Sequence, residues 1–342
     1  MTGAGGRRRW TCSTALAMAG VTLALGGCGG TDDSETAAPR AASSAELRDQ
    51  LQGATSSQAA DFPAVNGRSL QDVADGIGAA GPEYAPAGSI YTPGRNRLAF
   101  GIIDPTTGFV YGPTAVYLAE SPQAVARGPF PAPADLLVTD PPFRSEQAAA
   151  ESDPFAAIYS AEVDLPRPGR VAVLAVTKVK DQLVASNGEL KVIRPERDQM
   201  PAVGEPAPRV STDTTGDVAS IEEIDTRQPP DDLHDVDLKE ALGRKPVAVL
   251  FATPQLCHSR VCGPVVDIAL QLRERYGDRM EFIHQEVYVD NAVDRGLRPP
   301  LARFGLTSEP WLFVMNRQGI VTSRLEGSFG FTAMERAIRT GL

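Results

Sequence analysis

Two cysteines five positions apart, Cys257 and Cys262, are the residues of this 342-residue chain best suited to chemistry. An apolar run without polar alternation, Val247 to Phe251, precedes them and predicts a strand buried on both faces. Apolar residues spaced three or four apart follow, from Val265 to Leu272, and predict an amphipathic helix. The pair therefore lies between a buried strand and a helix N-terminus, where backbone N–H groups and the helix dipole stabilise a thiolate.

The spacing of the two cysteines restricts how they can form a disulfide. On one regular helix, Cα atoms five residues apart are about 8–9 Å apart, beyond the limit of about 7 Å for a disulfide. Pro264 suits the first turn of a helix, so we predict a helix start at about Gly263. A turn through residues 258–261, outside the helix, would then allow a Cys257–Cys262 disulfide.

Residues 233–342 resemble a thioredoxin-like domain. Besides the strand, cysteine loop and helix, the matching motifs are Thr307-Ser308-Glu309-Pro310 before the apolar strand WLFVM, and a closing hairpin and helix ending near Thr340. The resemblance implies an α/β thioredoxin-like fold with a mixed sheet, in which Pro310 is cis and faces the cysteine site. The family's CxxC is absent, because Val265 occupies the place of the second cysteine in CGPC.

The elongated cysteine loop also resembles those of the Sco-type copper chaperones and the peroxiredoxins. The segment VGEPAP, residues 203–208, resembles the lead-in of the TlpA and peroxiredoxin branch of thioredoxin-like proteins. Neither the Sco signature nor the peroxiredoxin signature is complete, so the resemblance implies the fold more specifically than the activity.

Three chemistries compete at the cysteine pair. In thiol–disulfide exchange, Cys262 would have the lower pKa and act as nucleophile, Cys257 would resolve the mixed disulfide, and Pro310 would shape the surface for a partner peptide. In a redox-inert binding module, the same disulfide would only pin the loop. In copper(I) delivery, the thiolates would be joined by His258 or His284, neither of which matches the histidine position of the Sco family.

The N-terminus reads as a targeting segment. Arg7, Arg8 and Arg9 form a positive region, and a short apolar stretch, Ala15 to Leu25, follows. Leu25-Gly26-Gly27-Cys28 resembles the bacterial lipobox, which implies cleavage after residue 27 and lipidation of Cys28. We therefore expect a lipid-anchored protein at the extracytoplasmic face of the cell membrane.

Cleavage after residue 27 has two further consequences. It removes Cys12, and with Cys28 lipidated the cysteine pair is left to meet an oxidising compartment. The formal net charge of −10 falls to −13 with the loss of three arginines, which argues against nucleic acid as a partner.

The remaining segments differ in composition and periodicity. Residues 28–82 are rich in small and polar residues and predict a flexible tether. Residues 83–195 contain period-two runs separated by turn residues, which indicate an all-β sandwich of immunoglobulin-like type. Within them, Pro122 to Ala150 reads as a long loop, and residues 196–232 read as a linker before the thioredoxin-like domain.

The sequence therefore predicts a membrane-anchored thioredoxin-like protein with an N-terminal β-sandwich. Its functional site is the cysteine pair, its partner is an extracytoplasmic protein, and its activity is thiol–disulfide exchange, with the redox-inert binding module and the copper(I) chaperone as alternatives. No carboxylate pair or Ser/His/Asp arrangement supports a hydrolase. We expect neither a cofactor nor a resident metal site.

Overall fold

The computed structural model describes residues 44–79, 81–150, 155–257 and 259–342. The expected signal segment, the lipidation site at Cys28 and His258 lie outside these ranges. Within the described ranges, no helix is both long enough and apolar enough to cross a membrane.

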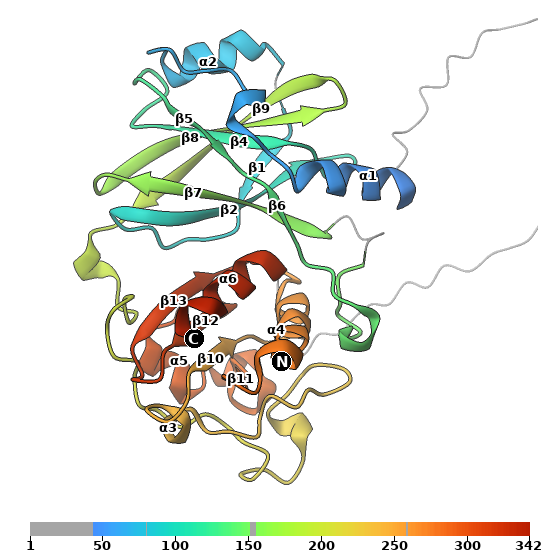
Figure 1. Cartoon of the computed structure of the whole chain (residues 1–342), viewed down its shortest axis with the longest axis vertical. Helices are drawn as coiled ribbons and strands as arrows, with labels where there is room; N and C mark the ends of the chain where they lie inside the picture. The colour runs from blue at the N-terminus through green and yellow to red at the C-terminus, as the bar shows by residue number, and fades with distance from the viewer. Residues whose placement is uncertain (1–43, 80, 151–154, 258) are drawn as a thin grey trace, which may run out of the picture. The chain divides into compact units, whose positions relative to one another are not determined.

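Residues 83–192, which we call the β region, form two antiparallel sheets (Figure 1). One sheet has the order β1-β2-β7-β6, with β3 paired to β2, and the other has the order β5-β4-β8-β9. The strands are β1 (Glu83–Pro86), β2 (Gly94–Asp104), β3 (Gly108–Phe109), β4 (Thr114–Ala119), β5 (Arg127–Pro131), β6 (Ala134–Leu136), β7 (Ala157–Leu165), β8 (Gly169–Val179) and β9 (Gln182–Val192).

Alternate side chains of these strands build a core that both sheets share. Leu98, Phe100 and Ile102 of β2 are fully buried and join one apolar cluster with Val116 of β4 and Val173 of β8. Alternation places them on one face because successive side chains of a strand point to opposite faces. The period-two runs in the sequence, which include Leu98, Tyr159, Val171 and Leu190, correspond to β2, β7, β8 and β9.

Residues 44–79 pack on the β region and do not form the expected tether. Leu51 joins the core between the sheets, and Leu70 and Val73 pack with the side chains of β4 and β8 that point away from that core. The prediction of a flexible segment over residues 28–82 is therefore wrong for this part, because composition alone does not reveal apolar partners elsewhere in the chain. The helices are α1 (Ser44–Ala54), η1 (Ala59–Asp61) and α2 (Leu70–Ile77).

Residues 233–342, which we call the α/β region, contain one four-stranded sheet of order β11-β10-β12-β13 (Figure 1). Strand β10 runs parallel to β11 and antiparallel to β12, and β12 runs antiparallel to β13. The mixed sheet implied by the family resemblance is thus present. The elements are α3 (Leu238–Ala241), β10 (Val247–Phe251), α4 (Cys262–Tyr276), β11 (Glu281–Gln285), α5 (Pro299–Phe304), β12 (Trp311–Met315), β13 (Val321–Glu326) and α6 (Phe331–Gly341).

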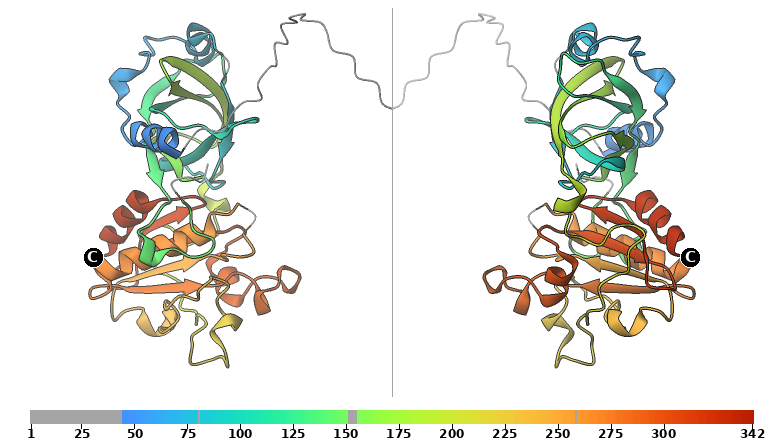
Figure 2. Two further views of the ribbon diagram at one scale, coloured as in Figure 1. Left: turned by 90° about the vertical axis from the view of Figure 1, so that its right-hand side faces the viewer. Right: turned by 90° about the vertical axis from the view of Figure 1, so that its left-hand side faces the viewer.

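Helices cover both faces of this sheet with their apolar sides (Figures 1 and 2). Leu250 and Leu312 point to one face and pack with α4 and α6, whereas Val249, Phe251 and Phe313 point to the other and pack with α3 and α5. Strand β10 is therefore buried on both sides, which explains its uninterrupted apolar sequence.

The loop between β6 and β7 reaches from the β region onto helix α4. Leu137 enters the core beneath α4, the Gln271 amide donates to Asp140 Oδ2 at 2.7 Å, and the Ser145 N–H donates to Asp267 Oδ2 at 3.1 Å. The predicted loop over Pro122–Ala150 is partly wrong, since β5 and β6 lie within it.

Residues 196–232, expected as a linker, are packed against the α/β region. Asp225, Thr226, Arg227 and Asp231 are all buried. Buried polar groups need partners, and the side chains of Thr226 and Arg227 find theirs in Glu286 and Asp267 of the α/β region. These contacts hold the segment against that region. Short 3₁₀ helices complete the structure: η2 (Pro141–Phe143), η3 (Pro195–Arg197), η4 (Ile221–Glu223), η5 (Val289–Asn291) and η6 (Val293–Arg295).

Candidate functional site at the cysteine pair

A tight turn carries the chain from the end of β10 to the start of α4. The Cys257 N–H donates to the Thr253 carbonyl at 3.1 Å, and the Arg260 N–H donates to the Cys257 carbonyl at 3.2 Å. Helix α4 begins at Cys262, with Val261 as its N-cap residue. Residues 259–261 lie outside the helix as expected, and the helix starts one residue earlier than predicted.

Both cysteines are free thiols that lie largely inside the protein. Cys257 is 9 % exposed and Cys262 is fully buried. The Cys257 Sγ lies 3.2 Å from the Ser259 hydroxyl oxygen. The Cys257–Cys262 disulfide stays a prediction.

The two thiols differ strongly in acidity. A hydrogen bond with the Cys262 thiol lowers the pKa of Cys257 to about 6; burial opposes this shift and the Ser259 hydroxyl adds to it. Burial raises the pKa of Cys262 well above its ordinary value, and the neighbouring Cys257 raises it further. At neutral pH the pair therefore holds one proton, with the negative charge on Cys257.

The prediction that Cys262 has the lower pKa is wrong. The position at the helix N-terminus is as expected, but burial disfavours the charged form of a thiol more than the dipole favours it. The β6–β7 loop packs against the first turn of α4, where a Cβ on Gly263 would lie 2.6 Å from the Gln147 Cβ.

The loop before β12 brings the Glu309 carboxylate to the neighbourhood of the thiols, and the segment after β11 brings the Tyr288 phenol. The Glu309–Pro310 peptide bond is cis, as the family resemblance implies. The Glu309 carboxylate raises the pKa of the nearby Cys262, and the Tyr288 hydroxyl donates to Glu309 Oε2 at 3.4 Å. Burial, Glu309 and then the two cysteines raise the pKa of Tyr288, so all four ionisable groups share one neighbourhood. The sequence analysis missed Ser259, Tyr288 and Glu309.

A cavity of about 460 Å³ opens beside the cysteine loop. Ser259 and Val261 line it from the cysteine loop, and Ser308 and Glu309 line it from the loop before β12. The β region supplies the facing wall, which includes Pro86, Ser89, Gly101, Phe109, Phe155 and Ile158. The reactive loop therefore borders a cavity of mixed polar and apolar character.

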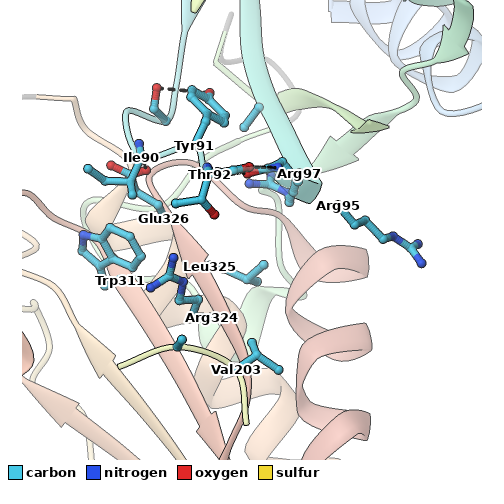
Figure 3. A pocket seen from close by; sticks show the side chains of 14 residues that line it. Ile90, Tyr91, Thr92, Arg95, Arg97, Val203, Trp311, Arg324, Leu325 and Glu326 are labelled. Atoms are coloured by element: carbon cyan, nitrogen blue, oxygen red, sulfur yellow. Dashed lines mark hydrogen bonds between the residues drawn. The ribbon is translucent and has the colours of Figure 1, made fainter. Parts of the chain in front are cut away.

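A second cavity, of about 300 Å³, shares Gly88 and Glu326 with the first (Figure 3). The Glu326 carboxylate accepts hydrogen bonds from the backbone N–H groups of Ser89 and Ile90, both at 2.9 Å, and so ties β13 to the β region. Three arginines line this cavity: Arg95 pairs with Glu162, Arg324 pairs with Asp198, and Arg97 donates to the Ser328 carbonyl at 2.7 Å.

His284 does not point to the thiols, which corrects its suggested role as a copper(I) ligand. Its Nδ1 lies 2.8 Å from Asp231 Oδ2, and its Nε2 lies 3.1 Å from the Ala252 carbonyl oxygen. With Asp225 and His234 it forms a separate, fully buried cluster. No sequence pattern indicated this cluster, because residues 231–234 are not helical and His284 comes from a separate strand.

Comparisons with known proteins give a structural likeness but no sequence relative. No known protein family and no curated protein matches the sequence. Among solved structures, the chain is similar to a protein of Chlorobium tepidum that is described, provisionally, as the thiol:disulfide interchange protein DsbE, at 14% sequence identity and a TM-score of 0.31. The match covers 41% of this chain and 98% of that protein.

Proposed function

We propose that this protein is a membrane-anchored, extracytoplasmic thiol–disulfide oxidoreductase that acts through Cys257 and Cys262. Its α/β region would be a thioredoxin-like domain, and its β region an immunoglobulin-like sandwich. The observation that carries the proposal is the unequal pair of free thiols, one with a pKa of about 6 and one with a raised pKa, beside a cavity. Such a pair offers a nucleophile and a resolving thiol at neutral pH.

The proposed reaction transfers two electrons to a partner disulfide, and the partner takes up two protons, one from Cys262 and one from the solvent. The Cys257 thiolate attacks one sulfur of a partner disulfide, the partner's S–S bond breaks, and the released partner thiolate takes a proton. Cys262 then loses its proton and attacks Cys257 Sγ, which breaks the mixed disulfide and releases the second partner thiol. The chain ends with a Cys257–Cys262 disulfide, and the reverse sequence oxidises a partner dithiol.

The partner would reach Cys257 through the 460 Å³ cavity. Its walls come from the cysteine loop, the loop before β12 and the β region, so the β region would take part in selecting the partner. Apolar side chains, such as Phe109 and Phe155, and polar groups at Ser89 and Ser308 suit an extended peptide with both kinds of side chain.

The decisive test is a redox and pH titration of the full-length chain, purified in detergent. We expect thiolate absorbance to rise with a midpoint near pH 6 in the reduced protein and to vanish in Cys257→Ser. Equilibration against glutathione should give a potential in the oxidoreductase range of about −120 to −270 mV. The Cys262→Ser variant should accumulate a mixed disulfide through Cys257, and Cys257→Ser is its matched control.

A second candidate function follows from the burial of the same pair. Cys262 is fully buried and Cys257 is 9 % exposed, which also suits a structural disulfide in a redox-inert partner-binding module. A potential below about −300 mV, with no mixed disulfide in Cys262→Ser, would support this function and reject the oxidoreductase.

Anchoring through Cys28 is part of the proposal and has its own test. The lipobox-like Leu25-Gly26-Gly27-Cys28 motif supports it. We expect wild-type protein to take up a labelled fatty acid and to sediment with membranes, and Cys28→Ala to lose both properties. Labelled lipid in Cys28→Ala would reject Cys28 as the anchor.

A further inference from the structure

A buried cluster of two histidines and two aspartates lies on the inner side of the cysteine loop. Asp225, Asp231 and His234 come from the segment before α3, and His284 comes from β11. All four side chains are buried, and one donor atom from each lies within 4.8 Å of the others. Imidazole nitrogen and carboxylate oxygen are ligands of zinc and of similar divalent metals.

The distances between these donor atoms are close to those of a tetrahedral metal site. Metal–ligand bonds of about 2.0–2.1 Å require tetrahedral ligand atoms to lie about 3.3 Å apart. His284 Nδ1 lies 2.8 Å from Asp231 Oδ2 and 4.0 Å from Asp225 Oδ1, and His234 Nε2 lies 3.4 Å from Asp231 Oδ1 and 3.7 Å from Asp225 Oδ2. Each histidine thus faces a different oxygen of each carboxylate, and a rotation of the two carboxylates that turns one oxygen of each toward both rings would admit an ion.

Hydrogen bonds hold the ligands in the orientation that a metal site needs. His284 Nε2 donates to the Ala252 carbonyl oxygen at 3.1 Å, and metal-ligating histidines commonly donate their other ring N–H to such an acceptor. His284 Nδ1 lies 2.8 Å from Asp231 Oδ2 and donates a proton to it, because a carboxylate oxygen only accepts. A bound cation would take the place of that proton. Backbone N–H groups of Arg227 and Asp231 donate to the two Asp225 oxygens at 2.7 and 2.6 Å.

His234 supplies an independent observation. It is fully buried, and among the described residues neither ring nitrogen has a hydrogen-bond partner. Its Nε2 is nevertheless aimed at the carboxylates of Asp225 and Asp231. An unpartnered buried polar group is costly, and a bond from Nε2 to a cation would remove one of these two costs.

We propose that Asp225, Asp231, His234 and His284 form a closed structural site for one divalent cation of the zinc class. Two carboxylates balance the two positive charges, and four protein ligands leave no open position, as in structural zinc sites. The site would fix the residues that support the cysteine loop: His284 holds the Ala252 carbonyl, and Thr226 accepts from the Gln255 N–H at 3.2 Å. This inference does not depend on the proposed redox function.

The first experiment separates this site from the thiols. In the full-length Cys257→Ser/Cys262→Ser protein, purified in detergent and stripped with a chelator, we expect one zinc ion to bind per chain. At zinc a thousandfold above its dissociation constant, Tm should rise by roughly 10 °C. Cobalt(II) should give the visible absorption of a tetrahedral site. A protein that binds no zinc in this background, or whose Tm zinc does not change, overturns the proposal.

The second experiment uses His234→Phe, which keeps an aromatic ring and removes the two unpartnered nitrogens. We expect zinc affinity to fall by more than about 100-fold and the Tm without metal to stay the same or rise, a combination that a merely structural histidine would not give. His258→Leu is the matched control, because His258 is the one histidine of the chain's three that the proposed site does not use. This variant should bind zinc normally. Unchanged zinc binding in His234→Phe overturns the proposal. If His234→Phe does not fold, Asp225→Asn must show the same loss of zinc.

Discussion

The β region and the α/β region bury different kinds of polar side chain. In the β region, hydroxyl groups predominate, such as Thr114 and Thr177, whose Oγ1 atoms lie 3.0 Å apart. In the α/β region and the segment that leads into it, ionised groups are buried, such as Arg227 and Asp267, which are 5% and 1% exposed. Apolar packing therefore holds the β region, whereas the α/β region keeps charges in a low-dielectric interior.

The location of the buried charges explains why the α/β region tolerates their cost. Burying a charge costs several kcal/mol unless partners compensate it. The compensated groups surround the segment that carries the cysteines: Asp267 lies on α4, His284 contacts the Ala252 carbonyl, and Thr226 contacts the Gln255 backbone. The comparison teaches that the β region is built for stability, while the polar interior of the α/β region positions a reactive loop.

The largest expected effect is the loss of an aromatic side chain from the β region. Phe100 is fully buried and stacks between Tyr84 and Tyr159, with centroids at 5.0 and 5.4 Å. Phe100→Ala should lower the free energy of unfolding by about 4 kcal/mol, measured by urea denaturation, and leave the Cys257 pKa unchanged. The control Val125→Ala, at a residue that is 63% exposed, should change the free energy of unfolding by less than about 0.5 kcal/mol. A shifted Cys257 pKa in Phe100→Ala would show that the core of the β region also controls the reactive loop, contrary to the proposed division of roles.

Breaking the buried ion pair should lower the free energy of unfolding by slightly less than Phe100→Ala does. Arg227 Nε donates to Asp267 Oδ1 at 2.9 Å, and burial already raises the pKa of Asp267 against the effect of Arg227. Arg227→Met leaves an unpaired buried carboxylate and should cost about 3 kcal/mol at pH 8. The cost should shrink as the pH falls, because the carboxyl then takes up a proton. Arg227→Met/Asp267→Leu should recover part of the loss, and a double variant no more stable than the single one would show that charge burial is not the cause.

The two regions are also joined by a helix cap. Removing this cap should lower the free energy of unfolding by less than either change above. Asp135 of β6 accepts from the N–H groups of Gly330, Thr332 and Ala333 at 2.9, 2.8 and 3.0 Å, because Gly330 at the N-cap of α6 has no side chain to do so. Asp135→Ala should cost about 1–2 kcal/mol in urea denaturation, whereas the exposed Asp164→Ala should cost almost nothing. Equal effects would mean that Asp135 is not an effective cap.

The sequence predicts what depends on local pattern. The apolar run Val247–Phe251 is strand β10 to the residue, and it is buried on both faces, as an uninterrupted apolar run indicates. The closing helix that the family resemblance places up to Thr340 is α6, Phe331–Gly341. The cis bond before Pro310 came from the family resemblance and not from pattern.

What the sequence does not predict depends on residues far apart in the chain. The pKa order of the cysteines depends on how deeply Cys262 is buried, which is a property of the whole fold and not of the local sequence. The His–Asp cluster needs residues from two segments, 225–234 and β11, whose meeting no local periodicity encodes. The packing of α2 on β4 and β8 is likewise a long-range contact.

The Cys257 thiol should make the stability of the reduced protein depend on pH. Its pKa is lowered from 9.0 to about 6 in the folded chain, chiefly by the Cys262 thiol, with Ser259 also contributing. A lowered folded pKa stabilises the folded state above the unfolded pKa, and this stabilisation is lost as the pH falls toward the folded value. The Tm of the reduced protein should therefore rise, relative to Cys257→Ser, between about pH 6 and 9. Parallel Tm curves for the two proteins would contradict the thiolate assignment.

The smallest effect tests one hydrogen bond of the reactive loop. Ser259 is exposed, its hydroxyl lies 3.2 Å from Cys257 Sγ, and it is a weaker cause of the lowered pKa than Cys262. Ser259→Ala should raise the Cys257 pKa by less than one pH unit and slow thiolate alkylation about two- to threefold at pH 6. At pH 8 the rate should match wild type, because Cys257 is then ionised in both proteins. Ser259→Thr keeps the hydroxyl and should behave like wild type at both pH values. An equal slowing at pH 6 and pH 8 would mean that Ser259 controls access to the sulfur, and the acidity of Cys257 would then rest on its buried partner Cys262.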